Sequence, residues 1–516
     1  MYKSKFVATG VRVWSNLNRL DGILTRHKQS TTWWLAGAVF VALNALLRFS
    51  INQPPVWDGA MSVFPAAIEL SKTDFDFARL FSLPTYYEGG PNTHATSPWT
   101  MLVAALISLT GSLTNALPIL HTISFGIAAL IIAATYRLIA HSAPGLIAVL
   151  GSLAVLLFPP MLVQSSDIYL DLPSTCLATW GLVFLLERRF IAASVLTTLA
   201  IWIKPLAIVF AAVLVAFVLI YGPPRRKVLL AASLAVPPLI VAGIVSVVNT
   251  SPSVRLPIGD RFAISINSTG EFIVTLPDVL AISAMALALV LFSRKEESGG
   301  DTFRIMTLVL MSIFGFVVAS PVVAIGVPLL PRYYITFLPA LMAGILTFLS
   351  SKSRRVAVIF TSIVAVAFAI NMNGAFYPHK EHPYFVLAER SLSYQDLLAL
   401  QIEDMSVLTA LSDDMPVFYD YFTFYRLEYP EMGYSDGPLE SGVSVFHSPE
   451  LTDASLADMP NRFAFVFEYP VLGGDVLQRV WDEAKTSGAV VTEIAMTRGS
   501  YTVYVVEVDQ SGSPSP

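Results

Sequence analysis

Long apolar runs separated by short polar segments dominate the first 372 residues of this 516-residue chain. A helix needs roughly 20 apolar residues to cross a bilayer, and several of the runs reach or approach that length. The pattern therefore predicts a polytopic α-helical membrane bundle. The runs lie at about residues 32–50, 98–113, 116–136, 145–160, 173–186, 190–203, 205–221, 228–248, 278–293, 305–327, 335–350 and 356–372.

A different pattern follows the last apolar run. Arg462 to Tyr469 is rich in residues that favour β-strands, and Val490 to Val508 alternates between apolar and polar positions like a pair of strands. Between them, Gly474 to Ser487 carries apolar residues at helical spacing, and further upstream the aromatic stretch Pro416 to Tyr425 indicates another strand. The pattern predicts a small soluble α/β domain over residues 373–516.

The charge of the chain divides at the same place. Residues 1–372 hold 25 basic and 15 acidic side chains, a net charge of +10, whereas residues 373–516 hold 7 and 22, a net charge of −15. The first part is too apolar for water and the second too acidic for lipid, which excludes a purely soluble enzyme and a bare helical bundle. The basic residues form short clusters and no single patch, which argues against a nucleic-acid partner.

The basic clusters predict the orientation, because Lys and Arg accumulate in short cytoplasmic loops. If all the clusters are cytoplasmic, the run 98–113 is half-inserted or interfacial and eleven spans remain. The expected protein crosses the inner or plasma membrane many times: a cytoplasmic tail (1–31), a bundle (32–372) with a first outer loop (51–97), and an extracytoplasmic domain (373–516). The clusters are the tail, Arg137, Glu187-Arg188-Arg189, Arg225-Arg226-Lys227, Arg294-Lys295 with Arg304, and Lys352 with Arg354-Arg355.

Acidic residues on the predicted outer side are functional candidates, because charges beside apolar spans are costly. Asp58 follows the first span and could accept a proton from an incoming hydroxyl or amine; the alternative is a solvated loop acid or a helix cap. Asp167 and Asp171 would share a face if helical, and with Asp58 they could hold a divalent cation. Alternatively, Asp171 only complements the dipole of the helix that begins there.

Two basic residues, Lys204 and Arg332, lie on the predicted outer side against the general bias of the chain. Their ammonium and guanidinium groups suit a phosphate, which Arg can bind through two parallel hydrogen bonds. The alternative is snorkelling toward lipid headgroups. Tyr333 adjoins Arg332, and Tyr87 and His94 flank the Gly- and Pro-rich return of the chain to the membrane; all three are candidate substrate contacts, or, for the aromatic residues, interfacial anchors.

These residues, in this order, resemble the GT-C superfamily of integral membrane glycosyltransferases. The superfamily includes protein O-mannosyltransferases, aminoarabinose transferases that modify lipid A, and arabinofuranosyltransferases. The resemblance covers roughly residues 30–372, with an outer domain after the bundle as in several members. It is carried by Asp58 after the first span, Thr96-Ser97-Pro98-Trp99-Thr100, Asp171-Leu172-Pro173, Ile201-Trp202-Ile203-Lys204-Pro205 and Arg332-Tyr333.

The resemblance implies transfer of a sugar from a polyprenyl-phosphate donor to a lipid, glycan or protein acceptor on the outer face, with inversion at the anomeric carbon. Asp58 would be the base or the acid that orients the acceptor, Asp171 and Asp167 would order the site or a metal, and Lys204 and Arg332 would hold the lipid phosphate. Many relatives carry two adjacent acids in the first loop, whereas Gly59 follows Asp58 here, which weakens the case for a divalent cation as cofactor.

Two other classes of protein remain as alternatives. A flippase or transporter of lipid-linked glycans would need polar residues inside the spans, which are sparse in the sequence, and has no evident use for an outer α/β domain. A glycan polymerase or ligase would share the two cations but favours long outer loops late in the bundle, whereas the long loop here, 51–97, comes first.

Overall fold

The computed structural model describes residues 20–55, 63–80, 96–248, 331–371, 407–419, 429–435, 441–444, 455–468, 475–487, 490–497 and 501–507, with a few isolated positions between them. Spatial proximity divides the chain into two units. The first consists of Met1–Ile51, Tyr87–Trp99 and Leu120–Tyr377, and the second of Asn52–Tyr86, Thr100–Ile119 and Pro378–Pro516. Much of the predicted first outer loop therefore groups with the C-terminal region.

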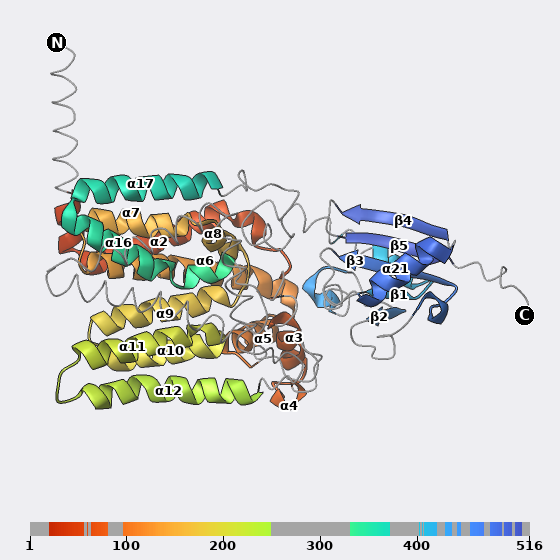
Figure 1. Ribbon diagram of the computed structural model, residues 1–516, viewed down its shortest axis with the longest axis horizontal. Coiled ribbons are helices and arrows are strands. Elements are labelled where there is room, and N and C mark those ends of the chain that lie inside the picture. Colours follow the sequence, from red (N-terminus) through yellow and green to blue (C-terminus); the bar gives the residue numbers. More distant parts are fainter. Residues whose placement is uncertain are drawn as a thin grey trace, which may run out of the picture. The chain divides into compact units, whose positions relative to one another are not determined.

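Helices build the described part of the first unit (Figure 1). Every predicted apolar run within the described residues forms a helix, and the runs at 278–293 and 305–327 lie outside them. The helices are α2 (Lys28–Leu46), α6 (Leu113–Ala140, from Leu120 onward), α7 (Gly145–Leu156), α8 (Pro159–Ser166), α9 (Asp171–Leu186), α10 (Phe190–Ile203), α11 (Ile208–Tyr221), α12 (Lys227–Val248), α16 (Leu338–Lys352) and α17 (Arg354–Asn371), with the 3-10 helices η1 (Arg48–Ser50), η3 (Pro205–Ala207) and η4 (Pro331–Thr336).

By length and composition, fewer described helices qualify as membrane spans than the eleven that the sequence predicts. Among the described residues, Leu113–Ala140 and Lys227–Ile244 are long and apolar enough to cross a membrane, and α7 with α8, bent by 64°, would make a third span. Five further helices are apolar but shorter, including α5 (Pro98–Thr110). The count of eleven spans and the half-inserted run 98–113 stay predictions.

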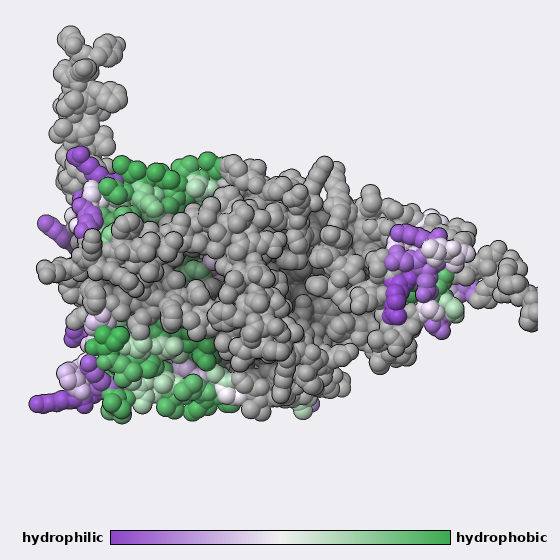
Figure 2. Space-filling model, in the orientation of Figure 1, coloured by the Kyte–Doolittle hydropathy of each residue, from purple (hydrophilic) through white to green (hydrophobic). Residues whose placement is uncertain are grey.

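Large apolar side chains cover the exposed faces of helices such as α12 and α17. Figure 2 shows this hydrophobic surface along the helices, with hydrophilic residues at their end on the left of the view. An exposed apolar face of this size is unfavourable in water and favourable in lipid, so these helices suit a bilayer. The exposed residues include Val228, Leu229, Leu239 and Ile240 on α12, and Ile359, Ile363 and Val366 on α17.

Several basic clusters meet at one end of the first unit. Arg137 forms an ion pair with Glu187, and Nη1 of Arg354 lies 3.3 Å from Oδ2 of Asp21. Nζ of Lys28 donates a hydrogen bond to the last carbonyl oxygen of α6. The starts of α2 and α17 therefore lie beside the ends of α6 and α9. Basic clusters that share the cytoplasmic side must lie at one end of the bundle, as they do here. That this end faces the cytoplasm stays a prediction.

The C-terminal part of the second unit contains a mixed five-stranded sheet in the order β2-β1-β3-β5-β4 (Figure 1). The central β3 (Arg462–Glu468) pairs in parallel with β1 (Val417–Tyr419) and antiparallel with β5 (Tyr501–Glu507). The edges are β2 (Gly442–Ser444), parallel to β1, and β4 (Val490–Thr497), antiparallel to β5. The predicted α/β pattern is confirmed, except that β2 was not predicted, since three residues are too few to show an alternation.

The core of this sheet region lies between the strands and α21 (Asp475–Ser487). Phe463 and Phe465 point to the same face of β3 because side chains alternate along a strand, and both are fully buried. Val480 and Ala484 of α21 are buried in the same cluster, and the ring centroid of Trp481 lies 5.7 Å from that of Phe465. The apolar face expected from the helical spacing is therefore the face that packs.

The first loop contributes two helices to the second unit, α3 (Phe64–Lys72) and α4 (Phe77–Leu80). The sequence predicts a helix with a mixed apolar face from Gly59 to Leu70. α3 begins later, with Pro65 in its first turn, a position that tolerates proline because the backbone N–H has no partner there. The same unit holds the 3-10 helices η5 (Pro430–Met432) and η7 (Leu456–Asp458).

Candidate functional site

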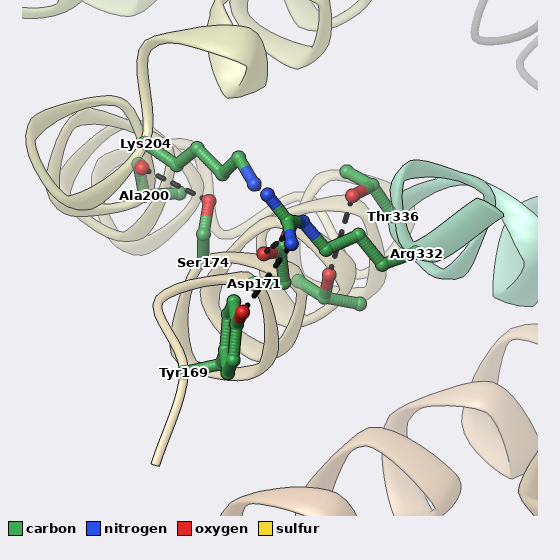
Figure 3. A network of polar contacts seen from close by, with 8 residues as sticks. Tyr169, Asp171, Ser174, Ala200, Lys204, Arg332 and Thr336 are labelled. Carbon is green, nitrogen blue, oxygen red and sulfur yellow. Dashed lines mark hydrogen bonds and ion pairs between the residues drawn. The ribbon is translucent and has the colours of Figure 1, made fainter. Parts of the chain in front are cut away.

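Three charged residues distant in sequence, Asp171, Lys204 and Arg332, meet in the first unit (Figure 3). Nζ of Lys204 forms an ion pair with Oδ1 of Asp171, and Nε of Arg332 lies 3.7 Å from Oδ2 of the same carboxylate. One carboxylate thus lies between two cations. The structure brings together the three residues that the sequence places on one side of the membrane, while their functional roles stay predictions.

Each of the three residues lies where a helix begins or ends. Asp171 is in the first turn of α9, where a carboxylate also complements the helix dipole. Lys204 follows α10 with extended backbone (φ −143°, ψ 113°), because the residue before a proline, here Pro205, disfavours the helical conformation. Arg332 is in η4, directly after Pro331. Prolines therefore place Lys204 between α10 and η3, and Arg332 at the start of η4.

The α9–α10 hairpin explains why Asp171 and Lys204 meet. α9 has 16 residues, which corresponds to about 24 Å along its axis, and it ends beside Glu187 among the basic clusters. α10 packs against α9 and returns to the starting end. The site therefore lies roughly one helix length from the end of the unit that gathers the basic clusters.

Hydroxyl groups join the elements around the carboxylate. Ser174 Oγ donates a hydrogen bond to the carbonyl oxygen of Ala200 at 3.0 Å, which ties α9 to α10. Thr175 Oγ1 and Thr336 Oγ1 lie 3.5 Å apart and connect α9 to η4 (Figure 3). All the hydroxyls are buried. These contacts fix the backbones that carry the three charges.

Two tyrosine rings lie beside the cations. Nη1 of Arg332 donates a hydrogen bond to the Tyr169 hydroxyl at 3.4 Å, and its guanidinium carbon lies 5.1 Å from the centroid of that ring. Nζ of Lys204 lies 4.3 Å from the centroid of the Tyr333 ring. Aromatic faces attract cations at these distances. The sequence marks Tyr333 as a candidate contact but not Tyr169, whose only sequence signal is its position two residues before Asp171.

The three charged side chains are largely closed to solvent, and together they carry a positive charge. The side chain of Asp171 is 0% exposed, that of Arg332 is 4% and that of Lys204 is 12%. One carboxylate against two cations leaves a net charge of +1 for the three residues. Removing charges from water is costly unless they are balanced by others, so the arrangement favours an anionic ligand beside the two cations.

Two of the metal ligands that the sequence suggests, Asp167 and Asp171, lie on different elements of the structure. Asp167 and Asp171 share no helical face, because α8 ends at Ser166, Asp167 has extended backbone and α9 begins at Asp171. Asp171 already faces two cations, a poor arrangement for holding a metal ion. In the part of the chain that the structure describes, no three His, Cys, Asp or Glu residues are grouped to hold a metal. Asp58, the third expected ligand, lies outside the described residues, so the divalent cation stays a prediction.

Three predicted site residues, Asp58, Tyr87 and His94, lie outside the described residues. Their predicted roles as base and substrate contacts are therefore neither supported nor contradicted by the geometry. The described neighbours of Asp58 belong to the second unit, which includes Asn52–Tyr86.

The chain is similar to solved structures of two glycosyltransferases. ArnT from Cupriavidus metallidurans bound to undecaprenyl phosphate is 16% identical over 94% of this chain and 100% of its own, with a TM-score of 0.48. The apo structure of the same protein is 15% identical over 94% of this chain and 100% of its own, with a TM-score of 0.40. Arabinofuranosyltransferase AftD from mycobacteria is 14% identical over 92% of this chain and 40% of its own, with a TM-score of 0.42. Both are GT-C glycosyltransferases, the superfamily that the sequence resembles. No protein-family model and no curated protein matches the sequence.

Proposed function

We propose that this protein is a GT-C-type membrane glycosyltransferase that transfers a sugar from a polyprenyl-phosphate carrier to an acceptor at the outer face of the membrane. The observation that supports this function is the buried pair of cations, Lys204 and Arg332, which both contact the carboxylate of Asp171. A net positive site next to apolar helices suits a ligand that is both anionic and lipidic. A polyprenyl phosphate has this combination, with its phosphate at the cations and its chain in the bilayer.

In the proposed reaction, an oxygen or nitrogen of the acceptor forms a bond to the anomeric carbon of the sugar. The bond from that carbon to the phosphate oxygen breaks, and its electron pair leaves with the polyprenyl phosphate. Negative charge grows on the phosphate as the bond breaks, so fixed cations beside it stabilise the transition state. Direct displacement from the opposite face inverts the anomeric carbon.

The acids have different roles in this proposal. Asp171 is engaged with both cations and would orient them toward the phosphate. The proton of the acceptor would then pass to Asp58, the base that the sequence resemblance assigns. The ring of Tyr169 would hold Arg332, and the ring of Tyr333 would hold Lys204.

The proposed function is tested in membranes supplied with labelled polyprenyl-phosphate sugars. Wild-type protein should yield a labelled acceptor, and Asp58→Asn should abolish transfer while leaving the amount of folded protein unchanged. Lys204→Met should weaken donor binding, because it removes one of the two cations. Asp76→Asn is the matched control, since Asp76 lies in the same loop and its carboxylate accepts a hydrogen bond from the Ala78 N–H at an exposed position.

Three outcomes separate the candidate functions. A labelled sugar on a new acceptor supports the glycosyltransferase, and the donor that is consumed identifies the sugar. Movement of intact labelled donor across the membrane would indicate a transporter, and joining of preassembled glycans would indicate a polymerase or ligase. Full transfer by Asp58→Asn would overturn the role of Asp58.

A further inference from the structure

A short segment of the C-terminal region, residues 429–435, holds the first loop of the chain within the second unit. The hydroxyl of Tyr434 donates a hydrogen bond to the carbonyl oxygen of Pro55 at 2.8 Å, although 379 residues separate the two. Nζ of Lys72 lies 2.6 Å from Oε1 of Glu431. We call residues 429–435 the loop clamp.

The two contacts of the loop clamp lie on either side of Asp58. Pro55 precedes Asp58 by three residues, and Lys72 is the last residue of α3, the first helix after it. Fixing both flanks of a short stretch removes much of the conformational freedom between them. The clamp therefore holds both flanks, Pro55 and Lys72, within the second unit.

The local backbone of the clamp explains how it reaches both flanks. Glu431 lies in the single 3-10 turn η5, and the chain then passes through Gly433 at φ +85° before Tyr434. A positive φ of this size is readily adopted by glycine and strained for residues with a Cβ. Met432 is fully buried between these positions and anchors the turn. A tight turn thus places Glu431 and Tyr434 against two different parts of the first loop.

We propose that the loop clamp positions Asp58 for the transfer step, so that the C-terminal region supports catalysis through the first loop. This inference rests on the proposed function, in which Asp58 is the base. Tyr434 and Glu431 are positioning residues, since they act through the backbone at Pro55 and through Lys72. Small displacements of a reacting group lower the rate sharply, so positioning of this kind affects kcat more than donor binding.

The two contacts should contribute unequally. Tyr434 is 1% exposed, so its hydrogen bond is shielded from water. The side chains of Lys72 and Glu431 are 51% and 38% exposed, and ion pairs in such positions contribute little. The hydrogen bond from Tyr434 is therefore the main contact, and the ion pair is a secondary one.

The main test is Tyr434→Phe, which removes the hydroxyl and keeps the ring. We expect kcat for sugar transfer to fall roughly fivefold, the effect of losing one buried hydrogen bond that orients a reacting group. The dissociation constant of undecaprenyl phosphate should not change, because the clamp acts through the first loop. The binding stoichiometry should not change either, and it shows that the variant is folded because it counts folded sites. Tyr419→Phe in β1 is the matched control, a buried tyrosine of the same region, and should retain wild-type kcat.

A charge exchange provides a second test. Lys72→Glu and Glu431→Lys should each lower kcat by up to about twofold, since each places like charges together at an exposed site. The double variant, Lys72→Glu with Glu431→Lys, should restore the wild-type value. Such a restoration requires the two side chains to act on each other, which general instability would not produce.

The inference fails if Tyr434→Phe keeps full kcat, or if Tyr419→Phe loses as much activity, because the loss would then reflect the stability of the whole region. These outcomes differ from failure of the proposed function. If Asp58→Asn retains full transfer, the base is wrong and the clamp has no base to position. If Asp58→Asn is inactive while Tyr434→Phe is fully active, only the clamp is wrong.

Discussion

At the scale of single residues, the shared carboxylate of Asp171 decides how two cations can occupy one buried site. Lys204 and Arg332 would repel each other there without it, and their ion pairs with Asp171 hold them side by side. The sequence indicated both cations, because a charge beside an apolar run is conspicuous. It did not indicate Tyr169, because tyrosines near membrane spans are common and only the fold places this one against Arg332.

We expect Asp171→Asn to lower the free energy of unfolding by about 3 to 5 kcal/mol, because two buried cations lose the carboxylate that both of them contact. Undecaprenyl phosphate should raise the melting temperature of this variant more than that of the wild type, since its phosphate supplies the missing negative charge. Thermal unfolding in detergent, with and without the lipid, measures both effects. An unchanged melting temperature for Asp171→Asn would contradict the pairing.

At the scale of the elements, close backbone contacts fix how the helices of the first unit meet. A Cβ added at Gly145, the first residue of α7, would lie 2.7 Å from Leu24 Cβ and 3.0 Å from the backbone nitrogen of Thr25. The Gly145 N–H also donates a hydrogen bond to Thr25 Oγ1 at 3.2 Å. The segment before α2 therefore packs directly on the start of α7, and only a glycine fits between them.

Gly145→Ala should destabilise the protein by about 1 to 3 kcal/mol, because the added methyl group meets backbone that cannot rotate away. Gly243→Ala is the matched control. Gly243 lies in α12 with nothing within 4 Å of an added Cβ, so alanine should be neutral or stabilise the helix by up to about 1 kcal/mol. Thermal unfolding of the two variants in the same detergent compares them, and equal melting temperatures would show that the contact at Gly145 is loose.

At the scale of the whole molecule, the charge of −5 is the sum of two opposite regions, +10 over residues 1–372 and −15 over residues 373–516. Ion pairs and hydrogen bonds at one end of the first unit gather Lys28, Arg137 and Arg354. Asp171, Lys204 and Arg332 lie about one helix length away, at the other end of α9. This separation is the one expected if the basic clusters are cytoplasmic and the site faces outward.

The orientation is tested with reporter fusions. A reporter placed after Gly222, within the loop before Arg225-Arg226-Lys227, should lie in the cytoplasm, because these residues belong to a short basic loop. A reporter after Asn373 should lie outside. Fusions at the two sites should therefore give opposite signals in a compartment-specific assay, and the same signal from both would overturn the predicted topology.

The sequence by itself determined the local structure and the candidate charges. Apolar runs predict helices, β-favouring residues predict β3, and alternation predicts β4 and β5. Prolines predict the corners at Lys204 and Arg332. Each of these signals acts within a few residues. It did not determine that Asp167 and Asp171 lie on separate elements, which depends on where α8 ends. Only the tertiary structure joined Asp171 to Lys204 and Arg332, and Tyr434 to Pro55. These pairs are distant along the chain, and their meeting depends on how whole elements pack, which no local pattern records.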